Sequence, residues 1–261
     1  MSIEKKSKRQ QRREQIKKQE ARSRIWMILL IILGAAFLVF AFVWPTIRAA
    51  TRPIEEVVTI DPGTHPNPND NSMGDPNAPI KIEEFSDFQC PYCERFHSDT
   101  EPLLRQYYID TGKVQFTYRS MGNWVSGNIG GASTESEDAA AAAYCAGEQN
   151  KFWEMHALLF ANVKGEDVGS FSDKRLKAIA EKVSGLDLEQ FNSCYDSGKF
   201  KDRVDQDKAD GSAAGITGTP AFLVMYTVNG ETKTKLIEGA QPFSVFQQEL
   251  EAALNEAGAQ D

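Results

Sequence analysis

The sequence has few of the histidines and cysteines from which zinc sites are built. It contains three histidines and four cysteines among 261 residues. A zinc site would have to combine Cys145 and Cys194 with the other two cysteines, but neither has a neighbouring cysteine or histidine at zinc-finger spacing. We therefore expect no metal and no other cofactor, and we interpret the scattered histidines as structural side chains.

The body of the chain also lacks an excess of basic residues. The net charge is −8, and residues 1–24 carry ten Lys or Arg against three Glu, which leaves a net charge of −15 for the remainder. An acidic body argues against a nucleic-acid-binding domain, so no nucleic-acid partner is expected. A basic tail and an acidic body are expected to serve different purposes.

Residues 25–44 contain no charged side chain. Twenty apolar residues can span the core of a bilayer, and a tryptophan lies near each end of the run, as in an aromatic belt. The basic residues precede it, so the positive-inside rule places residues 1–24 in the cytoplasm and the body outside. A cleaved signal peptide is the alternative, but its apolar region would have only about 7–15 residues. We predict a retained, single-pass signal anchor in the lipid bilayer.

Residues 45–77 are rich in proline. Six prolines fall in this stretch, with asparagine and aspartate between them. Such a composition cannot bury a core of its own. It predicts a flexible linker that spans roughly 30 Å and holds the following domain away from the membrane.

The pattern of a folded domain begins at residue 78. Alternating apolar residues at 79–85 and 114–119 predict two strands, and the helical pattern between them makes a strand–helix–strand unit. Asn229-Gly230 predicts the turn of a later hairpin. The whole predicted order is strand, helix, strand, helical block, two strands and helix, at residues 79–85, 90–110, 114–119, 135–214, 221–228, 232–237 and 242–257.

Cys90-Pro91-Tyr92-Cys93 follows the first predicted strand and lies on the first turn of the predicted helix. Two cysteines at this spacing can close a small disulfide ring. The helix N-terminus favours a thiolate at Cys90, and such surroundings lower a thiol pKa from ~8.5 to roughly 3.5–7.5. We predict a thiol–disulfide exchange site, with Cys90 as the exposed nucleophile and Cys93 as the buried resolving thiol. A structural disulfide and half of a zinc site are the alternatives.

Four motifs are distributed over the body of the chain: Gly74-Asp75-Pro76-Asn77-Ala78-Pro79, Phe85-Ser86-Asp87-Phe88-Gln89-Cys90-Pro91-Tyr92-Cys93, Lys151-Phe152-Trp153-Glu154-Met155-His156 and Gly215-Ile216-Thr217-Gly218-Thr219-Pro220. Together they resemble the DsbA-like branch of the thioredoxin superfamily, especially its membrane-anchored bacterial forms. The resemblance implies an α/β thioredoxin fold with an inserted all-helical domain, preceded here by one transmembrane helix. The expected parts are a cytoplasmic basic tail, a transmembrane signal anchor, a Pro-rich linker, a thioredoxin-fold domain in two pieces and the inserted helical domain, at residues 1–24, 25–44, 45–77, 78–120 with 215–261, and 121–214.

The resemblance also implies roles for three further residues. Pro220 would be a cis-proline facing the disulfide, and the backbone of Thr219 would pair with an extended substrate chain. Glu84 lies where the family carries a buried acid, which would pass a proton to or from Cys93. The alternation of a strand leaves open that Glu84 faces solvent and that Glu83 faces inward instead.

The second cysteine pair, Cys145 and Cys194, lies in the helical block on apolar stripes. Outside the cytoplasm such a pair favours a structural disulfide, and similar proteins in some bacterial groups carry one. Closing a loop of about fifty residues would contribute on the order of 4 kcal/mol in the chain-entropy model. Two buried free thiols are the alternative.

The resemblance finally implies an enzyme, a protein thiol–disulfide oxidoreductase of the disulfide oxidase type on the outer face of a bacterial cell membrane. Its substrates would be reduced exported polypeptides, and a membrane quinone-linked partner would reoxidise it. Two other functions stay open: a thiol reductase or isomerase for cytochrome c or metal-site maturation, and a non-catalytic tethered chaperone. The Pro91-Tyr92 dipeptide tunes the reduction potential but does not fix the direction of electron flow.

Overall fold

The computed structural model describes residues 22, 26–44 and 56–259. The predicted basic tail, except Arg22, and residues 45–55 of the predicted linker lie outside the described residues. The chain divides into two compact units, Met1–Ile54 and Glu55–Asp261, and each is described by itself.

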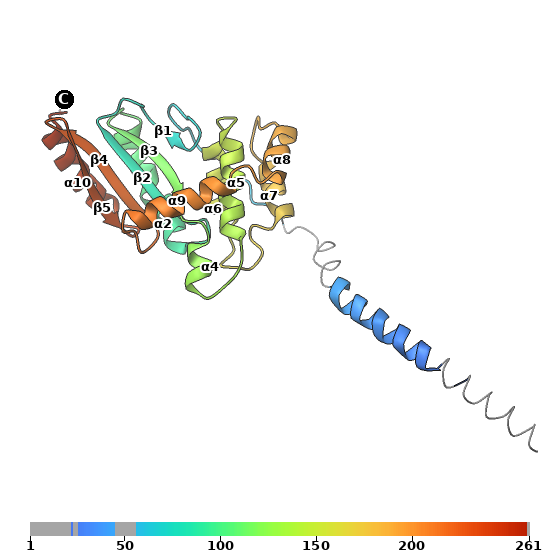
Figure 1. Ribbon diagram of the computed structural model, residues 1–261. Coiled ribbons are helices and arrows are strands. Elements are labelled where there is room, and N and C mark those ends of the chain that lie inside the picture. Colours follow the sequence, from blue (N-terminus) through green and yellow to red (C-terminus); the bar gives the residue numbers. More distant parts are fainter. Residues whose placement is uncertain (1–21, 23–25, 45–55, 260–261) are drawn as a thin grey trace, which may run out of the picture. The chain divides into compact units, whose positions relative to one another are not determined.

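The first unit contains one long apolar helix, Trp26–Trp44 (Figure 1). Its 19 residues are enough, by length and composition, to cross a membrane. Its large apolar side chains are exposed, Phe37 by 70% and Phe42 by 78%. A helix that is apolar on all sides needs an apolar environment around it. This helix coincides with the predicted signal anchor.

The second unit is built on a mixed five-stranded sheet (Figure 1). The strand order is β1-β3-β2-β4-β5, in which only β2 and β3 are parallel. Parallel neighbours require a crossover connection, and here a helical segment supplies it. The strands are β1 Ser72–Met73, β2 Ile80–Ser86, β3 Val114–Ser120, β4 Ala221–Val228 and β5 Glu231–Glu238.

The crossover from β2 to β3 contains α2 Pro91–Asp99, α3 Glu101–Leu104 and the π-helix η1 Arg105–Ile109. The α-helix is interrupted at Thr100, because Pro102 has no amide hydrogen for the carbonyl four residues earlier. Backbone hydrogen bonds of 3.0 Å from Thr100 to Phe96 and from Leu104 to Thr100 nevertheless carry the helical path across the interruption.

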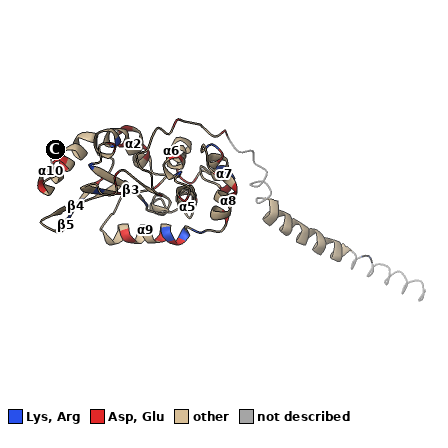
Figure 2. Ribbon diagram, turned by 90° about the horizontal axis from the view of Figure 1, so that it is seen from above, with Lys and Arg blue, Asp and Glu red and all other residues tan. Residues whose placement is uncertain are grey.

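Between β3 and β4 the chain forms six helices, and a last helix follows β5. They are α4 Trp124–Asn128, α5 Glu135–Gly147, α6 Phe152–Asn162, α7 Asp173–Ala180, α8 Leu188–Asp196, α9 Lys201–Ala213 and α10 Phe243–Ala257. The predicted α/β fold with an inserted block of helices is therefore confirmed. Helix α9, which carries charged residues of both signs (Figure 2), returns the chain from the block to β4.

The two faces of the sheet carry different clusters. Ile80 and Ile82 of β2 belong to the main core, which also contains Phe96 of α2 and Phe246 of α10. On the other face α9 lies close to the sheet, because a Cβ on Gly211 would meet Met121 and Phe85 within 2.8 Å. Helix α2 therefore packs on the face of β2 that carries Ile80 and Ile82, the even-numbered residues of that strand.

Residues 56–77 differ from the expected flexible linker. Asn162 of α6 pairs with both backbone groups of Val58 at 2.9 Å, and His65 stacks on Trp153 at 5.9 Å between ring centroids. Strand β1 adds to the edge of the sheet. Although this proline-rich stretch cannot bury a core of its own, it lies on the surface of a core that the rest of the domain supplies. The folded unit thus begins before residue 78.

Candidate active site

The turn between β2 and α2 is fixed by one buried carboxylate, Asp87. Its Oδ1 accepts hydrogen bonds from the amide of Gln89 at 2.8 Å and the hydroxyl of Ser136 at 2.5 Å. Its Oδ2 accepts from the amide of Val125 at 2.9 Å. Since Val125 and Ser136 belong to α4 and α5, this carboxylate ties the turn before Cys90 to the helical block.

Cys90 and Cys93 stand at different positions on α2. Cys90 is the N-cap residue, and Pro91 occupies the first helical turn, as the sequence predicts. Both cysteines are thiols in this structure. The prediction of an exposed Cys90 is wrong, because Cys90 is buried with 5% of its surface exposed; it is still more accessible than Cys93, which is completely buried.

The surroundings move the two thiol pKa values in opposite directions. A hydrogen bond from the Cys93 thiol is the main cause that lowers the pKa of Cys90 to about 6. The side chain of Thr219 and the amides of Cys93 and Tyr92 lower it further, while burial opposes them. Burial raises the pKa of Cys93 well above its ordinary value. The amides at the helix N-terminus, from which the sequence predicts a lowered pKa, therefore supply only part of the effect on Cys90.

Thr219 and Pro220 lie opposite the cysteines although they are about 130 positions away in the sequence. The peptide bond between them is cis. The Cys90 thiol donates a hydrogen bond to the carbonyl oxygen of Thr219 at 3.4 Å. Pro220 directly precedes β4, where a missing amide hydrogen does not disturb the sheet.

Glu84 faces the core beneath α2. Its side chain is 2% exposed and shares a face of β2 with Ile80 and Ile82. Burial raises the pKa of Glu84 to about 8. Its charge also contributes to the raised pKa of Cys93, so the two groups interact. Glu83 faces the other way and pairs with Arg119 at 3.2 Å, which excludes it as the inward-facing acid.

The structure adds residues that sequence reasoning did not select. His97 and His156, which were interpreted only as structural, have ring centroids 4.9 Å apart. Glu101 is 4% exposed, and its Oε2 lies 3.6 Å from Nδ1 of His97. One sequence signal was present, because Cys93, His97 and Glu101 recur every four residues.

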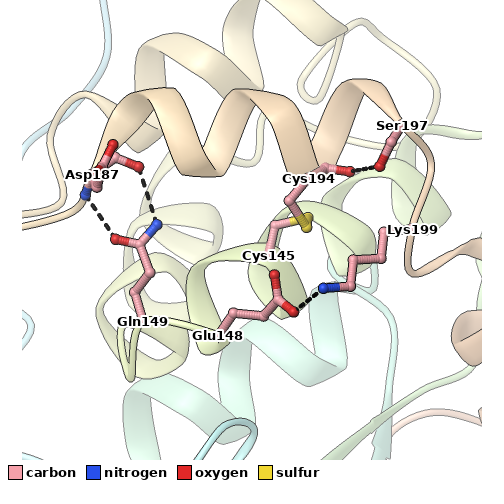
Figure 3. The surroundings of a disulfide bond; sticks show 7 residues. All are labelled: Cys145, Glu148, Gln149, Asp187, Cys194, Ser197 and Lys199. Atoms are coloured by element: carbon pink, nitrogen blue, oxygen red, sulfur yellow. Dashed lines mark hydrogen bonds and ion pairs between the residues drawn. A yellow bond between two sulfur atoms is a disulfide. The ribbon is translucent and has the colours of Figure 1, made fainter.

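The second cysteine pair is joined in the structure. Cys145 of α5 and Cys194 of α8 form a disulfide with a Cα–Cα distance of 5.8 Å (Figure 3). Beside it Gln149 and Asp187 exchange two hydrogen bonds, of 2.8 and 3.0 Å, between the same two parts of the block. Among the described residues, no group of three or more His, Cys, Asp or Glu side chains could hold a metal ion.

A Cys-x-x-Cys at the start of a helix, a cis-proline before the neighbouring strand and a block of helices inserted into the sheet define a protein of the thioredoxin class. The sequence model described as Thioredoxin matches residues 66–238, and the chain belongs to this family. Its motifs and the relatives below assign it to the DsbA-like branch, as predicted.

Three of the similar proteins illustrate the range of the match. The chain is 29% identical over 154 residues to the probable disulfide bond formation protein D of Bacillus cereus, covering 59% of this chain and 68% of that protein. It is 31% identical over 171 residues to the Na(+)/H(+) antiporter NhaA 3 of Salinispora tropica, covering 66% of this chain but only 23% of the antiporter. The crystal structure of Wolbachia pipientis alpha-DsbA1 superposes with a TM-score of 0.60 and 26% identity, covering 74% of this chain and 94% of that one.

Proposed function

We propose that this protein is a membrane-anchored thiol–disulfide oxidoreductase that oxidises cysteine pairs of exported polypeptides. The observation that carries the proposal is the pairing of an activated Cys90 with a buried Cys93 opposite the cis Thr219–Pro220 bond. The similarity to the Bacillus cereus protein, a probable disulfide bond formation protein, supports the same chemistry.

The reaction is a pair of thiol–disulfide exchanges. A substrate thiolate attacks the Cys90 sulfur of the Cys90–Cys93 disulfide, and Cys93 leaves as a thiolate that takes a proton from Glu84. A second substrate thiolate then attacks the substrate sulfur of the mixed disulfide, and Cys90 leaves as a thiolate. The substrate loses two electrons, which the cysteine pair gains.

The proposed direction of electron flow follows from the stability of the Cys90 thiolate that the reaction releases. A leaving thiolate with a low pKa departs faster, and stabilising it favours the reduced form of the pair. A pair whose reduced form is favoured is a stronger oxidant. The lowered pKa of Cys90 therefore supports an oxidase more than a reductase. A quinone-linked membrane partner would return the pair to the disulfide.

The proposed location is the outer face of a bacterial cell membrane, with the N-terminus in the cytoplasm. The Trp26–Trp44 helix supports the anchor, and the basic residues before it support the orientation. The Cys145–Cys194 disulfide supports an oxidising compartment, since disulfides rarely persist in the cytosol.

Two cysteine variants test the chemistry. Cys90→Ser should abolish oxidation of a reduced two-cysteine peptide. The variant cannot form the Cys90–Cys93 disulfide, and the remaining Cys93 sulfur is buried from an attacking thiolate. Cys93→Ser should instead accumulate a mixed disulfide between Cys90 and the peptide, which mass spectrometry of non-reduced protein detects. Peptide oxidation that persists in Cys90→Ser would contradict the role of Cys90. A wild-type protein that binds the reduced peptide without oxidising it would contradict the proposal and favour a tethered chaperone.

A redox titration of the wild-type protein against glutathione tests the direction. We expect a potential well above that of thioredoxin, which is about −270 mV. Alkylation of Cys90 should rise with pH through a midpoint near the pKa of about 6. A potential at or below the thioredoxin value would overturn the oxidase direction and leave a reductase.

A further inference from the structure

A cavity of about 470 Å³ borders the turn that carries Cys90. Gln89 and Pro91, the two neighbours of Cys90 in the chain, form one part of its wall. Residues 163–166, which follow α6, form another part, and Glu94 of α2 completes it. A cavity of this size can hold a long amino-acid side chain.

The cavity lies on the side of Cys90 that faces away from Thr219. Strand β2, which leads into the active-site turn, has β4 on one side and β3 on the other. The cis bond between Thr219 and Pro220 directly precedes β4. Helix α6 packs against β3, since the rings of Phe152 and Tyr118 lie 5.4 Å apart. An extended polypeptide that pairs with the backbone of Thr219 and crosses Cys90 is therefore directed toward the cavity.

The wall of the cavity carries more negative than positive charge. Glu94 is exposed and Glu166 is half-buried, and neither has an ion-pair partner among the described residues. Lys164 is the one cation among the residues that line the cavity. Asp167, which follows Glu166 in the chain, adds a third carboxylate at its rim. The charge of this wall is thus complementary to a cation.

The wall also offers apolar surface next to its carboxylates. Pro91 is exposed and Val163 is half-buried, and both line the cavity. Lysine and arginine side chains lay their methylene stems along apolar surface of this kind and keep the charged group in water.

We propose that this cavity takes the basic side chain of a lysine or arginine that lies next to the reacting cysteine of the substrate. The proposal rests on the proposed function, because it names a substrate class for the same site. The cation would pair with Glu94 and Glu166, and its stem would lie against Pro91 and Val163. These residues do not touch the reacting sulfurs, so they determine which polypeptide is preferred and leave the exchange steps as they are.

A set of three reduced two-cysteine peptides tests the proposal with the full-length protein in detergent micelles. The peptides differ only in the residues next to their cysteines, which are lysine, glutamine or glutamate. We expect kcat/KM to be roughly 5-fold higher for the lysine peptide than for the glutamine peptide, and lowest for the glutamate peptide, as for two exposed ion pairs. The rates of the same peptides with hydroxyethyl disulfide, which is small and neutral, correct for the effect of the flanking charges on the thiols themselves.

Glu94→Gln/Glu166→Gln shows whether the cavity causes the preference. The corrected ratio between the lysine and glutamine peptides should fall to near one in this variant, and a general loss of activity would not change that ratio. Glu189→Gln/Glu231→Gln is the matched control, since it removes the same total charge from exposed positions on α8 and β5 and should keep the preference. Added salt should weaken the preference of the wild-type protein, because it screens exposed charges.

The possible results separate this proposal from the proposed function. Equal corrected rates for the three peptides, or a preference that Glu94→Gln/Glu166→Gln retains, would overturn the subsite alone. A preference that Glu189→Gln/Glu231→Gln also loses would assign it to the total charge of the protein and overturn the subsite as well. A wild-type protein that oxidises none of the peptides would overturn the proposed function, and the subsite with it.

Discussion

The two active-site cysteines differ because they stand at different depths on the same helix. Cys90 caps α2, where amides and the neighbouring thiol stabilise its thiolate. Cys93 lies one turn further in, where burial makes its thiolate unfavourable. When a substrate thiolate attacks a disulfide with this asymmetry, the new bond is expected to form at Cys90, and Cys93 is expected to leave and become protonated. In the proposed reaction the rate would then depend on Glu84, the buried acid beneath Cys93.

Burial also controls the acidity of His156. Its imidazole is 2% exposed and is packed among aromatic rings, including Phe88 and Phe160. Burial lowers its pKa well below the ordinary value of 6.5, so the folded protein keeps it neutral. Below pH 6.5 only the unfolded chain binds this proton. The stability that neutral His156 preserves is therefore complete above pH 6.5 and is lost as the pH falls.

His156→Phe should remove this pH dependence, because phenylalanine fits the aromatic cluster and does not titrate. We expect the variant to gain stability over wild type by about 2 kcal/mol more at pH 5.0 than at pH 7.5, at ~1.4 kcal/mol per pH unit. Urea unfolding at the two pH values measures the difference. Glu84 and Glu101 titrate in the opposite sense, but they are present in both proteins and cancel. The same stability gap at both pH values would show that His156 does not titrate in this way.

At the level of helices and strands, local sequence patterns predict the strands that carry the site, but they do not predict the distant residues that hold the site in place. The predicted strands at 79–85 and 114–119 agree within a residue with β2 and β3, since each alternates between a core face and another face. Strand β1 could not be predicted, because it is only two residues long and the strand beside it, β3, lies far away in the sequence. Asp87 was missed for the same reason, as its partners Val125 and Ser136 are distant in sequence.

The disulfide between α5 and α8 supports the helical block and lies apart from the redox pair. Changing both cysteines to alanine in Cys145→Ala/Cys194→Ala should lower the free energy of unfolding by about 4 kcal/mol in the chain-entropy model. Peptide oxidation should stay near the wild-type rate, because Asp87 holds the active-site turn through α4 and the start of α5. Urea unfolding under non-reducing conditions measures the first effect.

Ser193→Ala is the control for this double variant, since Ser193 lies on the exposed side of α8 next to Cys194. It should unfold like wild type. An unfolding free energy of the double variant within ~1 kcal/mol of wild type would mean that the disulfide contributes little. A lost oxidase activity in a folded double variant would mean that the second pair takes part in the redox chemistry.

For the whole molecule, the proposal needs an anchor that keeps the thioredoxin-fold unit at a membrane. The Trp26–Trp44 helix exposes apolar side chains on every side, whereas the Glu55–Asp261 unit buries its own core. Exposing the apolar helix to water is unfavourable, whereas the folded unit is stable in water because its apolar side chains are buried. The two units are therefore expected to prefer different solvents, which is the physical basis of a tethered enzyme.

Leu33→Arg/Phe37→Arg tests the anchor. Each arginine near the centre of a spanning helix costs about 2.5–3.5 kcal/mol on the insertion scale, so two should shift much of the protein out of the membrane. Alkaline carbonate extraction of bacterial membranes separates inserted from peripheral protein. Ile129→Arg is the matched control, because it places the same charge on an exposed apolar residue of the folded unit and should leave the protein in the membrane. Extraction of the wild-type protein by carbonate, or retention of the double-arginine variant, would refute the anchor while leaving the disulfide chemistry untouched, since Cys90 and Cys93 belong to the other unit.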